Sequence, residues 1–147
     1  DMARLTRWLA AAMAVSVLAA WPARAQVRSD DELRRFLVGT WRGHHVEPTG
    51  THRWRRMVVG ADGRVVTDFK TCVPFPRRPC GAEPAEWSEP LETAGTARRV
   101  TDREFTLTRH WLPPFSPLTT RYSLLGSDSI RMEAEDPGWS EEYRRER

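Results

Sequence analysis

From residue 39 to residue 145, turn signals built from Gly, Pro and Asp divide the chain into short runs rich in β-branched and aromatic residues. Such runs are typical of β-strands, and none of them is followed by the periodic pattern of a long helix. Consecutive strands are therefore expected to pair as antiparallel neighbours. The eight or nine predicted strands span 39–47, 52–59, 64–71, 97–100, 104–112, 118–125, 129–135 and 139–145, the ninth being a short strand around Trp87.

Apolar and polar residues alternate along these strands, which predicts that one face of the sheet is buried. Phe105, Leu107 and Trp111 share one side of their strand, whereas Thr106 and His110 lie on the other. A sheet with one apolar face can bury it by curving around its own interior, and closure also removes exposed strand edges. The pattern predicts an all-β protein, an antiparallel up-and-down barrel of about eight strands.

A short helix is expected before the first strand. Ser29 and Glu32 have the spacing of a capping box, in which each residue satisfies a backbone N–H group near the helix start. Leu33 and Leu37 then form an apolar stripe, and Gly39 ends it. The helix is predicted over residues 30 to 37.

The first 25 residues have the pattern of a secretory signal peptide. Arg4 and Arg7 precede an uncharged apolar run from Trp8 to Trp21, and a small-x-small sequence ends at Ala25. This run is shorter than the roughly 20 residues that a membrane-spanning helix needs. We expect cleavage before residue 26 and a periplasmic or secreted domain over 26–147, without a membrane span; a retained signal anchor is the alternative.

Cleavage changes the interpretation of the charge. The whole chain has 23 basic and 20 acidic residues, a net charge of +3. Removing Arg4, Arg7, Arg24 and Asp1 leaves 20 basic and 19 acidic residues. A nearly neutral protein has no long-range field to attract a polyanion, so no nucleic-acid partner is expected.

Cys72 and Cys80 are the only two cysteines of the chain. In an oxidising compartment they are expected to pair with each other across a loop that carries three prolines. A metal site is the alternative, although two cysteines at this spacing match no zinc pattern.

The tripeptide Gly39-Thr40-Trp41, directly after the predicted helix, resembles the Gly-x-Trp motif of the lipocalins and the wider calycin barrels. In that family the glycine permits a tight entry into the first strand, the tryptophan plugs the closed end of the barrel, and an arginine from the last strand packs across it. The resemblance implies that Arg144 or Arg145 fills this last role. The chain departs from lipocalins in being short and in having no Thr-Asp-Tyr turn between its later strands.

The same outline is similar to small secreted inhibitors of bacterial metalloproteases, barrels whose N-terminal segment enters the protease cleft. That resemblance implies a protein partner bound through residues 26–29. Two proline-rich loops carry Phe75 and Phe115, which are expected either to be exposed for protein recognition or to fold back over an end of the barrel.

No catalytic motif is present: the sequence lacks a Gly-x-Ser-x-Gly elbow, a phosphate loop and a His-Glu-x-x-His helix. We therefore expect a non-catalytic protein without a cofactor, the alternative being an active site assembled from residues distant in sequence. A four-residue loop after Glu47 would pair His45 with Trp54 and bring His45 and His52 near the barrel mouth. These two histidines are weak metal-ligand candidates, the alternative being a polar rim.

Arg109 shares the apolar side of its strand with Phe105 and Trp111. A buried guanidinium needs a partner, which can be a carboxylate, an aromatic face or the anionic group of a ligand. The leading functional prediction is binding of a small hydrophobic or amphipathic ligand, and the alternative is a protein-interaction module such as a protease inhibitor. The predicted ligand-binding residues are Trp41, Trp54, Phe69, Phe105, Arg109, Trp111 and Tyr122.

Overall fold

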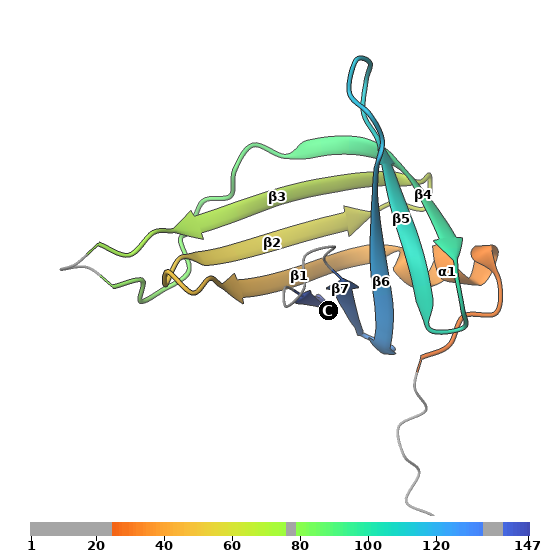
Figure 1. The fold of residues 1–147 in the computed structure, drawn as a ribbon, viewed down its shortest axis with the longest axis horizontal. Helices are drawn as coiled ribbons and strands as arrows, with labels where there is room; N and C mark the ends of the chain where they lie inside the picture. The colour runs from red at the N-terminus through yellow and green to blue at the C-terminus, as the bar shows by residue number, and fades with distance from the viewer. Residues whose placement is uncertain (1–24, 76–78, 134–139) are drawn as a thin grey trace, which may run out of the picture.

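Eight antiparallel strands close into a barrel in which each strand pairs with its neighbours in the sequence and β1 pairs with β8 (Figure 1). This computed structural model describes residues 25–75, 79–133 and 140–147. The all-β prediction is confirmed. The strands are β1 (Gly39–Val46), β2 (His52–Val59), β3 (Arg64–Cys72), β4 (Leu91–Arg99), β5 (Glu104–His110), β6 (Leu118–Gly126), β7 (Ser129–Glu133) and β8 (Ser140–Arg145).

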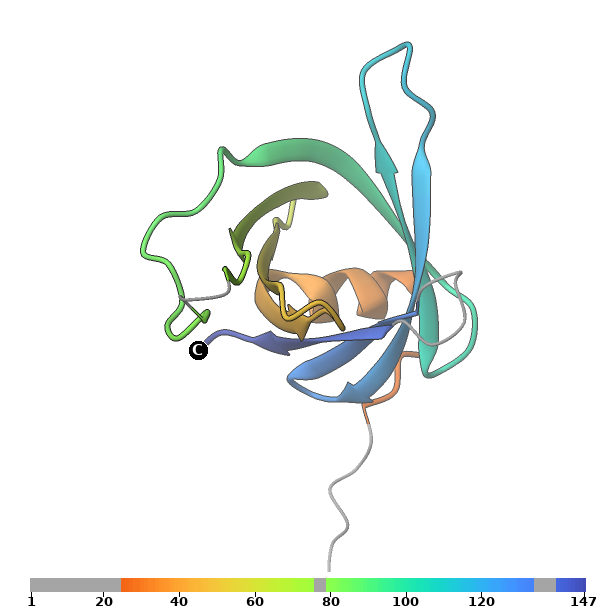
Figure 2. The same ribbon diagram turned by 60° about the vertical axis from the view of Figure 1, so that its left-hand side comes forward.

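The predicted helix is present as α1 (Asp30–Leu37) and crosses one end of the barrel (Figure 2). The Ser29 hydroxyl accepts a hydrogen bond from the Glu32 amide, and the Glu32 carboxylate accepts one from the Arg28 amide. Capping thus satisfies amide groups at the helix start that have no intrahelical partner. The stripe of Leu33 and Leu37 is fully buried against the barrel.

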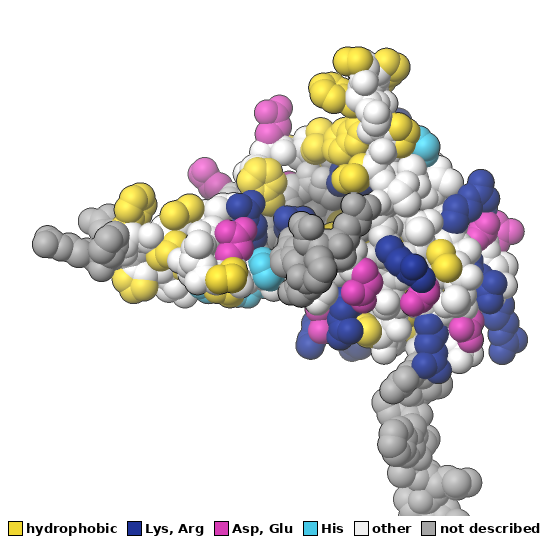
Figure 3. Space-filling view, in the orientation of Figure 1, with side chains coloured by type: hydrophobic (Ala, Val, Ile, Leu, Met, Phe, Trp, Pro, Cys, Tyr) yellow, Lys and Arg dark blue, Asp and Glu magenta, His cyan; other side chains and the backbone are white. Residues whose placement is uncertain are grey.

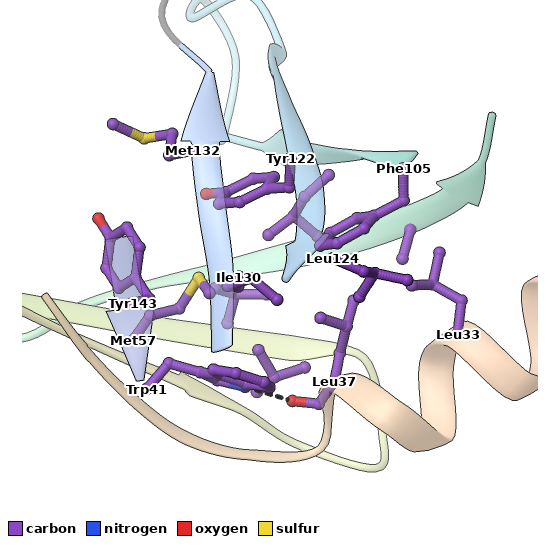
Figure 4. Close-up of a cluster of buried hydrophobic side chains, with 14 of the residues drawn as sticks. Leu33, Leu37, Trp41, Met57, Phe105, Tyr122, Leu124, Ile130, Met132 and Tyr143 are labelled. Carbon is purple, nitrogen blue, oxygen red and sulfur yellow. Dashed lines mark hydrogen bonds between the residues drawn. The ribbon is translucent and has the colours of Figure 1, made fainter. Parts of the chain in front are cut away.

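The hydrophobic core fills the end of the barrel beneath α1 (Figure 4). Trp41 and Phe105 are completely buried there, and the Trp41 indole N–H donates a hydrogen bond to the Leu37 carbonyl at 2.9 Å. This bond satisfies the one polar atom of the indole and fixes α1 against β1.

Arg145 is the arginine that packs across Trp41, which resolves the choice between the two candidates. Its guanidinium lies over the Trp41 and Phe36 rings and donates hydrogen bonds to the carbonyls of Phe36 and Val38. Gly39 has a φ of 136°, and a Cβ atom at this position would lie 3.0 Å from the Arg145 Nη1 atom. The entry into β1 therefore requires glycine for both conformation and space.

The predicted register between the first two strands is wrong by one residue. His44, and not His45, pairs with Trp54, because the connection is a five-residue loop over 47–51 and not four residues. Hydrogen bonds from the Glu47 amide to the Thr51 carbonyl and from the Gly50 amide to the Glu47 carbonyl close this loop. Since side chains alternate between faces, a shift of one residue moves Trp54 from the interior to the outer face.

Other predictions need smaller corrections. β4 begins six residues earlier than predicted, at Leu91, and residues 79–90 contain no strand around Trp87.

Cys72 and Cys80 form a disulfide, as expected, with their Cα atoms 5.9 Å apart. The predicted signal peptide, apart from Ala25, lies outside the described residues. None of the helical structure in the described part of the chain is both long enough and apolar enough to cross a bilayer.

Candidate ligand site in the barrel

A cavity of about 940 Å³ occupies the part of the barrel away from α1. The inward-facing residues of β2, β3, β5, β6, β7 and β8 contribute to its wall. Phe69 and Leu118 line the cavity and are each 53% exposed, so they mark its opening to solvent. The volume falls within the range of roughly 300–1,000 Å³ that is usual for small-molecule sites.

The cavity wall combines an apolar surface with cationic groups. Met57, Met132 and the ring of Tyr122 lie at its inner end, next to the core (Figure 4). Arg53 and Arg55 enter from β2, where they alternate with the outward-facing residues. Arg53 is paired with Glu47, and the Arg55 Nε atom lies 3.5 Å from Glu141. Two of the cations in the wall therefore already have carboxylate partners.

Arg109 differs from these two arginines. Its Nε atom donates a hydrogen bond of 3.0 Å to the Thr93 hydroxyl, its Nη2 atom donates one of 2.8 Å to the Thr67 hydroxyl, and its guanidinium lies 5.1 Å from the Trp111 ring centre. Among the described residues, no carboxylate forms an ion pair with it. Burial lowers the pKa of Arg109, but a guanidinium stays protonated in proteins. The cavity thus contains a half-buried cation whose partners within the described part of the chain are all neutral.

Glu141 is buried between β8 and β1, beside the cavity. Its Oε2 atom faces Arg55 and accepts a hydrogen bond of 3.4 Å from the Tyr143 hydroxyl, whereas its buried Oε1 atom accepts none. Burial raises the pKa of Glu141, and the nearby Arg55 opposes that shift. Burial also raises the pKa of Tyr122 to about 12 and that of Tyr143 further, so both phenols are neutral hydrogen-bonding groups.

Of the seven predicted ligand-binding residues, Phe69, Arg109 and Tyr122 line the cavity. Trp41 and Phe105 are completely buried in the core beneath it, and Trp111 stacks on Arg109. Trp54 lies on the outer face, in the stack with His44 and His52, because the observed pairing of β1 with β2 places it on the face opposite to the predicted one. Two of the six predicted aromatic residues, Trp41 and Phe105, therefore build the closed end of the barrel instead of lining the cavity.

Sequence reasoning missed the polar part of the wall. Arg53 and Arg55 look like surface residues in an Arg-rich strand, and Thr67 and Thr120 resemble ordinary strand positions. Strand parity was the signal that could have found the two arginines, since the correct register places them on the same face as Met57 and Trp41.

The two weak metal candidates, His45 and His52, lie on opposite faces of the sheet in the observed register, so they do not share a site. No group of three or more His, Cys, Asp or Glu residues that could hold a metal ion occurs in the ranges that the structure describes.

The two loop phenylalanines do not fold back. Phe75 is 69% exposed and Phe115 is 71% exposed, and apolar side chains cover the projecting hairpin between β5 and β6 (Figure 3). The N-terminal segment, by contrast, is anchored to the barrel. Val27 is buried, its amide donates a hydrogen bond to the Asp102 carbonyl, and its carbonyl accepts one from Arg99 Nε.

Comparison of the chain with protein-family models, with curated proteins and with solved structures found no match.

Proposed function

We propose that this protein is a non-catalytic, extracytoplasmic binder of a small amphipathic molecule, which it holds inside the barrel with an anionic group against Arg109. The observation that carries the proposal is the half-buried Arg109 guanidinium in the cavity wall, whose partners among the described residues are two threonine hydroxyls and a tryptophan face. A carboxylate or another singly charged oxyanion from a ligand would supply the ion-pair partner that Arg109 does not find among the described residues.

The shape and lining of the cavity support the amphipathic character of the ligand. Arg109 projects into a space whose inner end is formed by Met57, Met132 and Tyr122, so an anion bound there leaves an attached apolar chain next to apolar surface. Burial of that chain contributes roughly 25 cal/mol for each Å² of apolar area removed from water. A filled interior would have favoured a protein-interaction module, and the open volume favours the binder.

Likeness to a lipocalin-type barrel supports the same interpretation. The Gly39–Trp41 motif after α1 and the packing of Arg145 on Trp41 are the features that this family shares. The disulfide between Cys72 and Cys80 and the secretory pattern of residues 1–25 support a periplasmic or secreted location.

Native mass spectrometry of the protein recovered from its own host is the first test. A retained small molecule with one anionic group is the expected result, and a ligand-free monomer under conditions that preserve the fold would contradict the proposal. A fluorescence titration then compares a medium-chain fatty carboxylate with the alcohol of the same chain length.

In that titration the wild-type protein is expected to prefer the carboxylate. Arg109→Gln is expected to weaken carboxylate binding by about tenfold or more and to leave alcohol binding unchanged, because the substitution removes a charge-assisted contact. Arg131→Gln changes an exposed arginine of β7 and is the matched control. Equal affinity of the wild-type protein for both compounds would overturn the assignment of Arg109.

A second candidate function is protein recognition through the two proline-rich loops. The exposure of Phe75 and Phe115 favours it, since rigid loops with accessible aromatic side chains lose little entropy on docking. A protein that co-purifies in the native mass spectrum of the wild-type protein, and is lost in a Phe75→Ser/Phe115→Ser variant, would support this function in place of the first.

A further inference from the structure

Two histidines lie side by side on the outer face of the β1–β2 hairpin, on the side of the sheet away from the cavity. His44 and His52 are diagonal neighbours in the observed register, in which His44 pairs with Trp54 and His52 pairs with Val46. Their facing nitrogens, Nε2 of His44 and Nδ1 of His52, are 2.9 Å apart. Neither residue belongs to the wall of the cavity.

The distance between these nitrogens is that of a hydrogen bond, and it is also the separation of two nitrogen ligands that meet at a right angle on one metal ion. Two nitrogen ligands about 2.0–2.1 Å from a metal ion are about 2.9 Å apart when they meet at a right angle, and about 3.3–3.4 Å apart at the tetrahedral angle. Right-angled nitrogen ligands are typical of square-planar and tetragonal ions, of which Cu(II) binds imidazole most strongly among the divalent first-row metals.

The hairpin fixes how far apart the two histidines are. Three rings stack on one another: the His44 ring lies 4.8 Å from the Trp54 ring at an angle of 2°, and the His52 ring lies 5.4 Å from it. The hydrogen-bonded loop over 47–51 fixes the register of the two strands. The backbone therefore need not rearrange on binding, and only the two imidazole rings turn so that both nitrogens face the ion.

The charges around the pair also suit a metal ligand. The nearby cations on the same outer face are paired with carboxylates: Arg42 and Lys70 with Glu83, and Arg56 with Asp68. When an ion replaces the hydrogen bond between the rings, the shared proton moves to the outer nitrogen of the same imidazole, so no net proton is released.

We infer that His44 and His52 form a two-nitrogen binding site for a tetragonal divalent transition-metal ion, Cu(II) above all, on the outer face of the barrel. Water or an exogenous ligand completes the coordination, since His44 is exposed to solvent. The site is independent of the cavity and of Arg109, so the two proposals succeed or fail separately.

The test is a titration of the untagged protein, from residue 26 onward, with copper sulfate alone, followed by electron paramagnetic resonance and by tryptophan fluorescence. One tetragonal Cu(II) with two nitrogen ligands per chain is expected, with quenching of the fluorescence. His44→Ala and His52→Ala are each expected to weaken binding by about tenfold or more, because each removes a ligand. Trp54→Phe is expected to reduce the quenching while the resonance signal of the bound ion remains.

The matched control is His110→Ala, which removes a histidine of β5 whose ring contacts the Thr96 hydroxyl. This variant is expected to bind copper like the wild-type protein. Near-UV circular dichroism of the His44 and His52 variants verifies that the barrel is intact, so loss of binding can be assigned to the missing ligand. Copper binding that survives in the His44→Ala/His52→Ala double variant, or zinc binding to the wild type as tight as copper binding, would overturn the inference.

Discussion

The guanidinium carbon of Arg145 lies 4.3 Å from the centre of the Trp41 ring, at the end of the barrel that α1 covers. The same side chain donates hydrogen bonds to the carbonyls of Phe36 and Val38. Arg145 therefore connects the last strand to the first strand and to the end of the helix. It compensates its partial burial with an aromatic face and two acceptors.

Replacement of Arg145 by methionine is expected to lower the free energy of unfolding by about 2–3 kcal/mol, because the cation–π contact and two hydrogen bonds are lost together. Urea unfolding measures this difference. Arg144→Met, at the neighbouring outward-facing position with 80% exposure, is the control and is expected to change stability by less than about 0.5 kcal/mol. Equal effects of the two substitutions would show that the contact with Trp41 does not stabilise the barrel.

Gly39→Ala is expected to lower the free energy of unfolding by about 1–3 kcal/mol, since alanine strains a residue with a φ of 136° and its Cβ atom meets Arg145. Thermal and urea unfolding test this expectation. Gly81→Ala is the matched control, because a Cβ atom there has no neighbour within 4 Å. A Gly39 variant as stable as the Gly81 variant would contradict the argument.

Glu141→Gln is expected to change how stability depends on pH. Burial raises the folded-state pKa of Glu141 above its ordinary value of about 4.5, so the folded protein binds more protons than the unfolded chain above that pH. The free energy of unfolding therefore loses this contribution as the pH rises through the folded-state pKa. Glutamine cannot ionise, so the stability of the variant relative to wild type is expected to increase as the pH rises from about 4.5 through the folded-state pKa of Glu141.

Urea unfolding at several pH values gives this comparison. Glu142→Gln alters an outward-facing residue of the same strand and is expected to follow the wild-type curve. A relative stability of the Glu141 variant that stays constant or falls with pH would show that the carboxylate is compensated in the folded state, for example by Arg55.

Reduction of the bond between Cys72 and Cys80 is expected to lower the free energy of unfolding by about 2.5 kcal/mol, as loop-closure entropy predicts for a loop of this length. Unfolding with and without a reductant measures the effect. A Cys72→Ala/Cys80→Ala variant should match the reduced protein and should not respond to reductant.

Much of the fold was predictable because its signals are local. The capping residues around Ser29, the alternation in β5 and the turn glycines each predict their own segment, and together they indicate an antiparallel barrel. The choice between Arg144 and Arg145 needed the structure, since it depends on the pairing of β8 with β1 across almost the whole chain.

The site was harder to predict than the fold. One additional loop residue between β1 and β2 exchanges the inner and outer faces of β2, which moves Trp54 outside and Arg55 inside. Loop length is set by hydrogen bonds such as that between Glu47 and Thr51, which the composition of the loop does not specify. The isolation of Arg109 from any described carboxylate likewise depends on contacts among three strands, β3, β4 and β5.

The close-packed core and the open cavity are built from different segments of the same strands. Phe105 and Arg109 are four residues apart on β5, yet one is fully buried in the core and the other faces the cavity. Substitutions at the mouth can therefore change what the barrel accepts while the packed end keeps the chain folded. A protein arranged in this way can acquire new ligands over evolutionary time without passing through unstable intermediates.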